Sequence, residues 1–143
     1  MREALRLARE GAAGGEVPVG AVVTIGGEVV GRGWNAPIAH QDPTAHAEIL
    51  AMREAALRIG NYRLESASLY CTLEPCVMCA GALVAARVSR LVFGARDLRF
   101  GGVRSKFRVA DSDLLNHSVE IVEGVLAAEC VELLRRFFEA RRD

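Results

Sequence analysis

The sequence has no apolar run that approaches the length of a membrane span, and its first residues do not form a signal peptide. These absences argue against a membrane protein and predict a cytoplasmic location, where thiols stay reduced. Only four of the 143 residues are cysteines, so a disulfide scaffold is not expected. Cys71 and Cys130 are interpreted as buried apolar residues, because only Cys76 and Cys79 have the spacing of metal ligands.

The chain also lacks net charge, with 18 basic and 18 acidic residues. Overall charge therefore argues weakly against nucleic-acid binding. The distribution is uneven, however, because residues 87–108 hold seven basic side chains and one acid, a local net charge of +6. Such a stretch can contact phosphates or form a solvated loop, and charge alone leaves both interpretations open.

Local patterns predict one domain over residues 1–143. Helices are expected at 3–13, 44–59, 75–86 and 126–141, and strands at 17–25, 29–34, 66–72, 90–94 and 119–123. Residues 26–28 predict a hairpin turn, and residues 35–43 and 95–105 predict loops. Thr44 is expected to cap the second helix, and Pro75 to open the third. Strands that alternate with helices after a hairpin indicate an α/β fold of three layers, α/β/α, with a mixed sheet.

Two short segments supply the side chains of a zinc site. Cys76 and Cys79 are three residues apart near a predicted helix start, so both thiols lie on one face, where the helix dipole favours thiolate. His46 and Glu48 are roughly 200° apart on an ideal helix, so they can approach one point only beyond its N-terminus. The zinc is therefore expected between two helix N-termini, with Glu48 beside it.

Three protein ligands leave one coordination position open for water, which is typical of catalytic zinc. A structural zinc site needs a fourth ligand, and no other cysteine or histidine has suitable spacing. A structural zinc site and a redox Cys-x-x-Cys pair are the alternatives.

His-x-Glu followed by Pro-Cys-x-x-Cys is a signature of zinc deaminases. Longer segments extend the match: Val-Pro-Val-Gly-Ala-Val at 17–22, Gly-Trp-Asn at 33–35, Asp-Pro-Thr-Ala-His-Ala-Glu at 42–48, residues 70–82, and Val-Phe-Gly-Ala-Arg-Asp at 92–97. From about Leu5 to Phe138 the chain resembles the bacterial tRNA-specific adenosine deaminases of the zinc-dependent cytidine/deoxycytidylate deaminase family. The resemblance implies a cytidine-deaminase-like fold with a five-stranded sheet, one Zn²⁺ per chain, a homodimer, and a tRNA anticodon loop as partner.

The same resemblance implies a role for each matching residue. It assigns the zinc ligands to His46, Cys76 and Cys79, and the proton shuttle to Glu48. It places Asn35 against the target nucleotide, the Ala47 amide against the base, Val17 in the wall of the base pocket and Asp97 near the sugar. Candidates for RNA contact are Arg96, Arg99, Phe100, Arg104 and Phe137, whereas Phe138 is expected to face the core.

The implied reaction is hydrolysis of a C–N bond of a cyclic amidine: zinc-bound hydroxide attacks C6 of the wobble adenosine, and Glu48 carries the protons. After Asp97 the chain departs from the usual Lys-Thr-Gly-Ala run, and it places Phe100 and Arg104 in a loop expected to touch RNA. Deamination of a free base or nucleoside of guanine or cytosine type is the alternative activity. A non-catalytic RNA-binding subunit is a further alternative, which Glu48 disfavours because such proteins typically lose the shuttle carboxylate.

Overall fold

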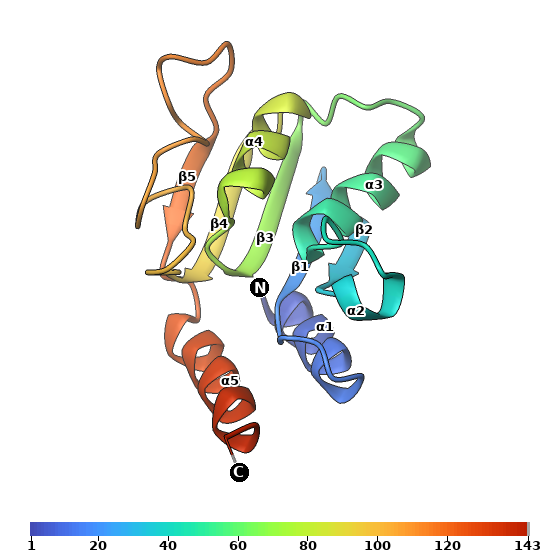
Figure 1. The fold of residues 1–143 in the computed structure, drawn as a ribbon. Coiled ribbons are helices and arrows are strands. Elements are labelled where there is room, and N and C mark those ends of the chain that lie inside the picture. Colours follow the sequence, from blue (N-terminus) through green and yellow to red (C-terminus); the bar gives the residue numbers. More distant parts are fainter. Residues whose placement is uncertain (143) are drawn as a thin grey trace.

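The computed structural model describes residues 1–142 and confirms the predicted α/β fold. The helices are α1 (Arg2–Ala13), α2 (Pro37–His40), α3 (Ala47–Ile59), α4 (Val77–Ala85) and α5 (Ala127–Ala140), and the strands are β1 (Gly20–Ile25), β2 (Glu28–Trp34), β3 (Ala67–Leu73), β4 (Arg90–Ala95) and β5 (Glu120–Glu123) (Figure 1). All the predicted strands and long helices are present, with ends displaced by at most three residues.

The sheet has the strand order β2-β1-β3-β4-β5. Strand β1 runs antiparallel to β2 and β3, whereas β3, β4 and β5 run parallel to one another. Gly26 and Gly27 connect β1 to β2 with φ values of 58° and 81°, a conformation that suits a tight hairpin turn. Because Leu73 pairs with Ala95, the carboxyl ends of β3 and β4 lie side by side, and the residues after them enter the site.

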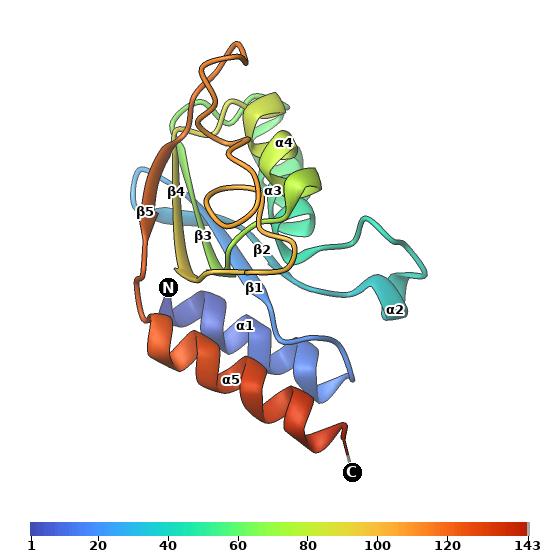
Figure 2. The ribbon, with the colours of Figure 1, turned by 60° about the vertical axis from the view of Figure 1, so that its left-hand side comes forward.

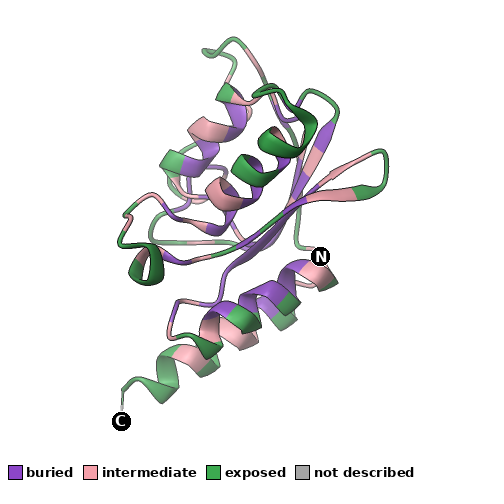
Figure 3. Ribbon diagram, turned by 90° about the vertical axis from the view of Figure 1, so that its right-hand side faces the viewer, coloured by how far each residue is buried: buried purple, intermediate pink, exposed green. Residues whose placement is uncertain are grey.

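Helices cover both faces of the sheet. Figure 2 shows α1 and α5 on one face, with α3 and α4 on the other, as the predicted three-layer arrangement requires. The buried residues of α1 are Ala4, Leu5, Leu7, Ala8 and Gly11. They appear in purple along the ribbon of this helix in Figure 3. Among residues 1–142, no helix combines the length and the apolar character that a membrane crossing requires.

Small residues let α3 lie close to β2. Ala47, Ala51 and Ala55 recur at one-turn spacing on α3, and all three are fully buried. Gly33 faces them from β2, and a Cβ atom there would lie 2.5 Å from the carbonyl oxygen of Ala47. The absence of a side chain at Gly33 therefore fixes how closely the first turn of α3 approaches the sheet, and with it the position of His46.

Two predicted helix starts are wrong. Thr44 does not cap α3, because its amide and hydroxyl donate to Asp42 Oδ1 at 2.8 and 2.7 Å, and His46 takes the N-cap position. Pro75 does not open α4, because the next residue, Cys76, is the N-cap and the helix begins after it. Both corrections place a predicted metal ligand at the N-cap position of a helix.

The predicted loop at 35–43 contains the single-turn helix α2. Glu16 is 3 % exposed, and its carboxylate accepts hydrogen bonds from the amides of Ala39 at 2.8 Å and Ile38 at 3.4 Å. Amides at a helix start lack partners within the helix, and a carboxylate satisfies them. The acceptor, Glu16, lies 22 residues before Ile38, so no local sequence pattern predicts this helix.

The Gly33→Ala substitution is expected to lower the free energy of unfolding by roughly 1–3 kcal/mol, because the added methyl group overlaps the backbone of α3. Urea unfolding followed by circular dichroism measures the change. Gly81→Ala is the matched control: no atom lies within 4 Å of a Cβ at this position, in the interior of α4. This control should gain roughly 0.5–1 kcal/mol. Equal stability of Gly33→Ala and the wild type would contradict the packing argument.

Candidate metal centre and active site

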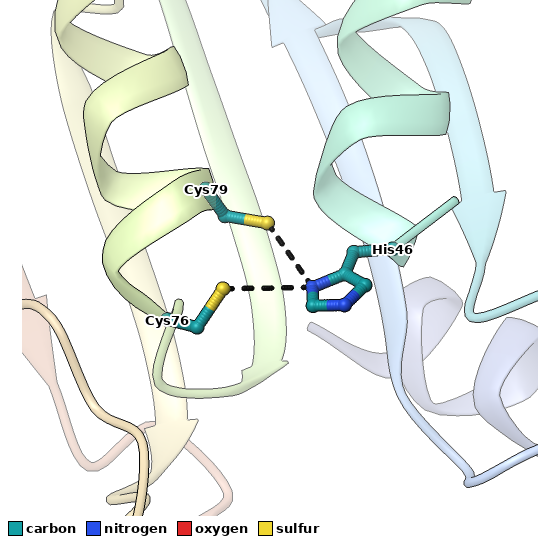
Figure 4. Close-up of side chains that lie close together, drawn as sticks. All are labelled: His46, Cys76 and Cys79. Atoms are coloured by element: carbon teal, nitrogen blue, oxygen red, sulfur yellow. Dashed lines mark hydrogen bonds between the residues drawn. The ribbon is translucent and has the colours of Figure 1, made fainter. Parts of the chain in front are cut away.

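Three side chains converge where the N-termini of α3 and α4 face each other. His46 is the N-cap residue of α3, Cys76 is the N-cap residue of α4, and Cys79 lies in the first turn of α4. The Nδ1 atom of His46 lies 3.5 Å from the Sγ atoms of both Cys76 and Cys79 (Figure 4). The predicted meeting of donors from two helix N-termini is confirmed.

These distances fit a tetrahedral zinc ion. A Zn–N bond of about 2.05 Å and a Zn–S bond of about 2.3 Å at the tetrahedral angle place nitrogen and sulfur about 3.5 Å apart. The ligand atoms of His46, Cys76 and Cys79 all lie within 4.8 Å of one another. Within residues 1–142 no fourth His, Cys, Asp or Glu joins this group, so a zinc ion held by these three side chains would keep one position for water, as in catalytic zinc sites.

The two thiols hold their protons unequally. A hydrogen bond from Cys79 lowers the pKa of Cys76 to about 4, and the neighbouring His46 ring contributes to the same shift. That hydrogen bond, together with burial, raises the pKa of Cys79. Cys76 is therefore a thiolate at neutral pH, which is the form that binds metal. Cys71 and Cys130 are buried and free, as predicted.

Glu48 is the second residue of α3 and is only 4 % exposed. Burial raises the pKa of its carboxyl group, and the nearby His46 ring partly opposes the shift. A carboxyl group with a raised pKa can both accept and release a proton near neutral pH. Glu48 stands beside the three donors, and it lines the same pocket as His46 and Cys76.

The pocket at this site has a volume of about 700 Å³. The predicted site residues in its lining are Val17, Asn35, His46, Glu48, Cys76, Arg96, Asp97, Arg99 and Phe100. The lining also includes Val19, Leu73, Glu74, Leu98, Leu134 and Phe138, which the sequence did not single out for the pocket. Apolar walls with a few polar groups are typical of a small-molecule site.

Two further predicted residues lie behind the lining. Ala47 is fully buried at the first position of α3, so its amide is one of those without an acceptor in the helix. Cys79 is also buried, and its Sγ atom lies 3.5 Å from Nδ1 of His46. The backbone amide of Asn35 donates to the Val19 carbonyl at 3.0 Å. This bond fixes the chain where it leaves β2, beside the pocket.

Asp97 shapes the rim of the pocket after β4. Its Oδ1 atom accepts hydrogen bonds from the amides of Arg99 at 3.0 Å and Phe100 at 3.1 Å. The Arg99 guanidinium lies 5.2 Å from the centroid of the Phe100 ring, and this ring is 61 % exposed. Arg96 pairs with Glu123 at 2.8 Å. The rim therefore presents an exposed aromatic ring and a cation next to each other.

Arg104 occupies a different position from the one expected of an RNA-contacting residue. Its guanidinium donates to both carboxylate oxygens of Asp111, each at 3.0 Å, and its side chain is 20 % exposed. Arg108 also contacts Asp111, at 3.3 Å. The position of Arg104 favours a role in holding the loop together.

Of the two aromatic residues of α5, Phe138 lies contrary to expectation, whereas the RNA contact of Phe137 stays a prediction. Phe138 was expected in the core, yet it is 46 % exposed and lines the pocket. Phe137, expected near RNA, is half-buried and lies outside the pocket lining, edge-to-face with Phe138 at 5.3 Å and with the Arg141 guanidinium 4.1 Å from its ring centroid. Adjacent residues on a helix point about 100° apart, and the sequence alone did not settle which one faces inward.

Sequence reasoning gave no role to Glu74, which is 2 % exposed and accepts hydrogen bonds from four backbone amides of residues 97–105. Burial opposes its ionisation, but these donors and the Ser105 hydroxyl outweigh burial and lower the pKa of the carboxyl group. One feature of the sequence could have drawn attention to Glu74: it is an acidic residue between an apolar strand and a proline, directly before the metal-binding cysteines.

Comparisons with known proteins agree with this geometry. The family model described as the cytidine and deoxycytidylate deaminase zinc-binding region matches residues 1–95. The tRNA-specific adenosine deaminase of Haemophilus influenzae is 51 % identical and aligns with 100 % of this chain and 83 % of its own length. A structure from a study of A-to-I editing by tRNA:A34 deaminases at the wobble position is 41 % identical, with a TM-score of 0.91 over 94 % of this chain and 97 % of the other.

More distant relatives share the fold as well. A guanine deaminase from Nitrosomonas europaea is 26 % identical, with a TM-score of 0.83 over 95 % of this chain and 81 % of the other. Because the family model covers more than half of the chain and includes both metal-binding segments, the chain belongs to the zinc-binding cytidine and deoxycytidylate deaminase family.

Proposed function

We propose that the protein hydrolyses adenosine to inosine at the wobble position of a tRNA anticodon. The observation that supports the reaction class is the buried Glu48 beside the three converging donors, where Glu48, His46 and Cys76 line one pocket. The substrate is supported by the Haemophilus influenzae relative, named a tRNA-specific adenosine deaminase, and by the tRNA:A34 deaminase structure.

His46, Cys76 and Cys79 would hold the zinc ion. Zinc in such a site lowers the pKa of bound water to about 7 and so supplies a nucleophile at neutral pH. Glu48 accepts the proton that water loses and delivers it to N1 of adenine, which makes C6 more electrophilic. After the C6–O bond forms, Glu48 moves the hydroxyl proton to the amino nitrogen, the C6–N bond breaks, and ammonia leaves.

Four residues are proposed to hold the target nucleotide. Val17 forms an apolar wall for the base, and Asn35 binds the nucleotide from the end of β2. The Ala47 amide, at the N-terminus of α3, donates to the base. Asp97 lies near the sugar, and one of its oxygens is already committed to the loop amides. A base must leave its stack to reach this pocket, which costs least in a single-stranded loop.

The rim is proposed to bind the rest of the anticodon loop. Single-stranded RNA is commonly bound by aromatic stacking and by cations near phosphates. Phe100 offers an exposed ring, with Arg99 over it. Arg96 lies at the same rim, although Glu123 offsets part of its charge.

A homodimer is proposed as the assembly. Val77 and Met78 are exposed apolar residues on α4, directly after the metal ligand Cys76. Exposed apolar side chains that cluster are typical of contact surfaces. A second copy that covers this part of α4 would lie next to the site and would extend the RNA-binding surface.

Deamination of a free base is the second candidate function, because the guanine deaminase of Nitrosomonas europaea shares the fold with a TM-score of 0.83. The open rim with Arg99 and Phe100 favours a substrate larger than a base.

The zinc-loaded protein is expected to form inosine in an anticodon stem-loop with a wobble adenosine, and to leave guanine, cytosine and cytidine unchanged. Mass spectrometry of the digested RNA and an ammonia assay measure the two outcomes. In the Glu48→Ala variant, turnover should fall by at least about 10²-fold while zinc stays at one per chain, because Glu48 moves protons without binding metal.

Turnover of guanine without inosine in RNA would replace the first candidate function with the second. A Glu48→Ala variant that works at the wild-type rate would remove Glu48 from the proton-transfer steps.

Phe100→Ala is expected to weaken stem-loop binding by roughly 1–3 kcal/mol through loss of base stacking. Arg99→Ala should make the slope of log Kd against log salt concentration shallower, by about the contribution of one phosphate contact. Fluorescence anisotropy with a labelled stem-loop at several salt concentrations measures both effects.

Arg104→Ala is the matched comparison, because the Arg104 guanidinium is paired with Asp111. It should lower the melting temperature and leave the salt dependence unchanged. A salt dependence altered by Arg104→Ala and not by Arg99→Ala would reverse this assignment.

Met78→Glu is expected to yield monomers, because a charge would be buried at the proposed interface. Light scattering coupled to gel filtration should then give a mass near the 15.4 kDa of one chain, against twice that mass for the wild type. Leu57→Glu, at an exposed position of α3, is the control and should remain dimeric. A wild-type protein that is monomeric at micromolar concentration would refute the dimer.

A further inference from the structure

The Glu74 carboxylate lies at the centre of a set of hydrogen bonds that join two segments. Glu74 directly follows β3 and is 2 % exposed. Its Oε2 atom accepts hydrogen bonds from the amides of Arg104 at 2.7 Å, Ser105 at 2.9 Å and Val103 at 3.1 Å, and its Oε1 atom accepts from the Asp97 amide at 3.1 Å and from the Ser105 hydroxyl. Five donors fix a single side chain in one orientation.

These bonds hold both ends of the loop of residues 97–105 on the segment that precedes α4. The Gly102 amide donates to the Pro75 carbonyl at 2.8 Å, and Gly101 forms a bridge with Cys76. Gly101 lies so close to the Glu74 carboxylate that a Cβ atom would overlap it. The loop backbone is therefore packed directly against the residues that deliver the first thiolate.

The same set of bonds continues to the pocket rim. The Asp97 amide donates to Glu74, and the Asp97 carboxylate accepts from the amides of Arg99 and Phe100. The Gly101 amide closes this turn on the Asp97 carbonyl at 2.9 Å. The backbone amide of Phe100 is thus connected to the Glu74 carboxylate through Asp97, by two hydrogen bonds.

We infer that Glu74 is a positioning residue: it holds the loop of residues 97–105 against the metal-binding segment and so sets where Arg99 and Phe100 meet the substrate. This inference rests on the proposed function, which supplies the substrate class. Glu74 acts through the loop, because loop donors occupy both of its oxygens. It differs in this respect from Glu48, which faces the reacting atoms.

Two substitutions separate positioning from general stability. Glu74→Ala removes the acceptor for all five donors. Glu74→Gln keeps an oxygen for the Val103, Arg104 and Ser105 amides and puts an NH2 group in place of Oε1, so the Asp97 amide loses its acceptor and the Ser105 hydroxyl must turn to accept a hydrogen bond instead of donating one. For the zinc-loaded Ala variant, KM for the anticodon stem-loop should rise at least about tenfold, with kcat within about threefold of the wild type. The Gln variant should restore KM to within about threefold.

Two readouts besides activity accompany these measurements. Zinc content should stay at one per chain in both variants. Hydrogen exchange measured by mass spectrometry should speed up in a peptide that covers residues 97–105 of the Ala variant, and not in a peptide that covers α1.

Leu64→Ala is the matched control, because it opens a cavity in the core before the start of β3, at the opposite end of that strand from Glu74. At a temperature well below both melting transitions, its KM should equal that of the wild type. An equal rise in KM for Leu64→Ala would overturn the inference, because global stability would then explain the effect. Loss of zinc from the Glu74→Ala variant, or an unchanged KM, would overturn it as well.

Failure of the proposed function is a separate result. If the wild type does not act on the stem-loop, the substrate assignment is wrong, and hydrogen exchange of residues 97–105 decides the positioning role by itself. Faster exchange in the Glu74→Ala variant would support the positioning role of Glu74, and unchanged exchange would refute it.

Discussion

The meeting of two helix N-termini is the constraint on which the site depends. Each N-terminus carries partial positive charge and amides without partners, and α3 and α4 direct these ends at one point (Figure 4). The sulfur atoms of Cys76 and Cys79 lie at the start of α4, and a divalent cation held there would bind both of them as thiolates. The glycines of β2 and the alanines of α3 set the distance at which the ends meet. Glu48, in the first turn of α3, lies beside the three donors.

Much of this arrangement could be predicted because the chemistry permits few side chains. A zinc ion requires nitrogen and sulfur donors at fixed spacings, so His46, Cys76 and Cys79 are visible in the sequence. The predicted helix starts at Thr44 and Pro75 are wrong for an instructive reason. Propensity rules give the N-cap to Ser, Thr, Asp or Asn, whereas in this protein the metal ligands themselves occupy both N-cap positions.

The loops around the site could not be predicted, because their conformations depend on residues that are distant in sequence. Glu16 and Glu74 hold segments that follow them by 22 to 31 residues, and no local pattern links the two parts. The basic stretch at 87–108 shows the same difficulty. Counted locally it has a net charge of +6, yet Arg96 and Arg104 pair with Glu123 and Asp111, which lie outside the counted residues. The cationic surface available to RNA is accordingly smaller than the sequence indicated.

The way in which the rim is held also accounts for its unusual sequence. Glu74 accepts hydrogen bonds mainly from backbone amides, so the side chains at Arg99, Phe100 and Arg104 can differ from those of relatives without releasing the loop. Gly101 and Gly102 are constrained, because neither has room for a Cβ atom. Asp97 and Ser105 are constrained by the hydrogen bonds of their side chains. The catalytic groups, in contrast, are fixed by helices and by metal geometry. Changes in the loop can therefore alter which RNA is bound while the deamination chemistry stays the same.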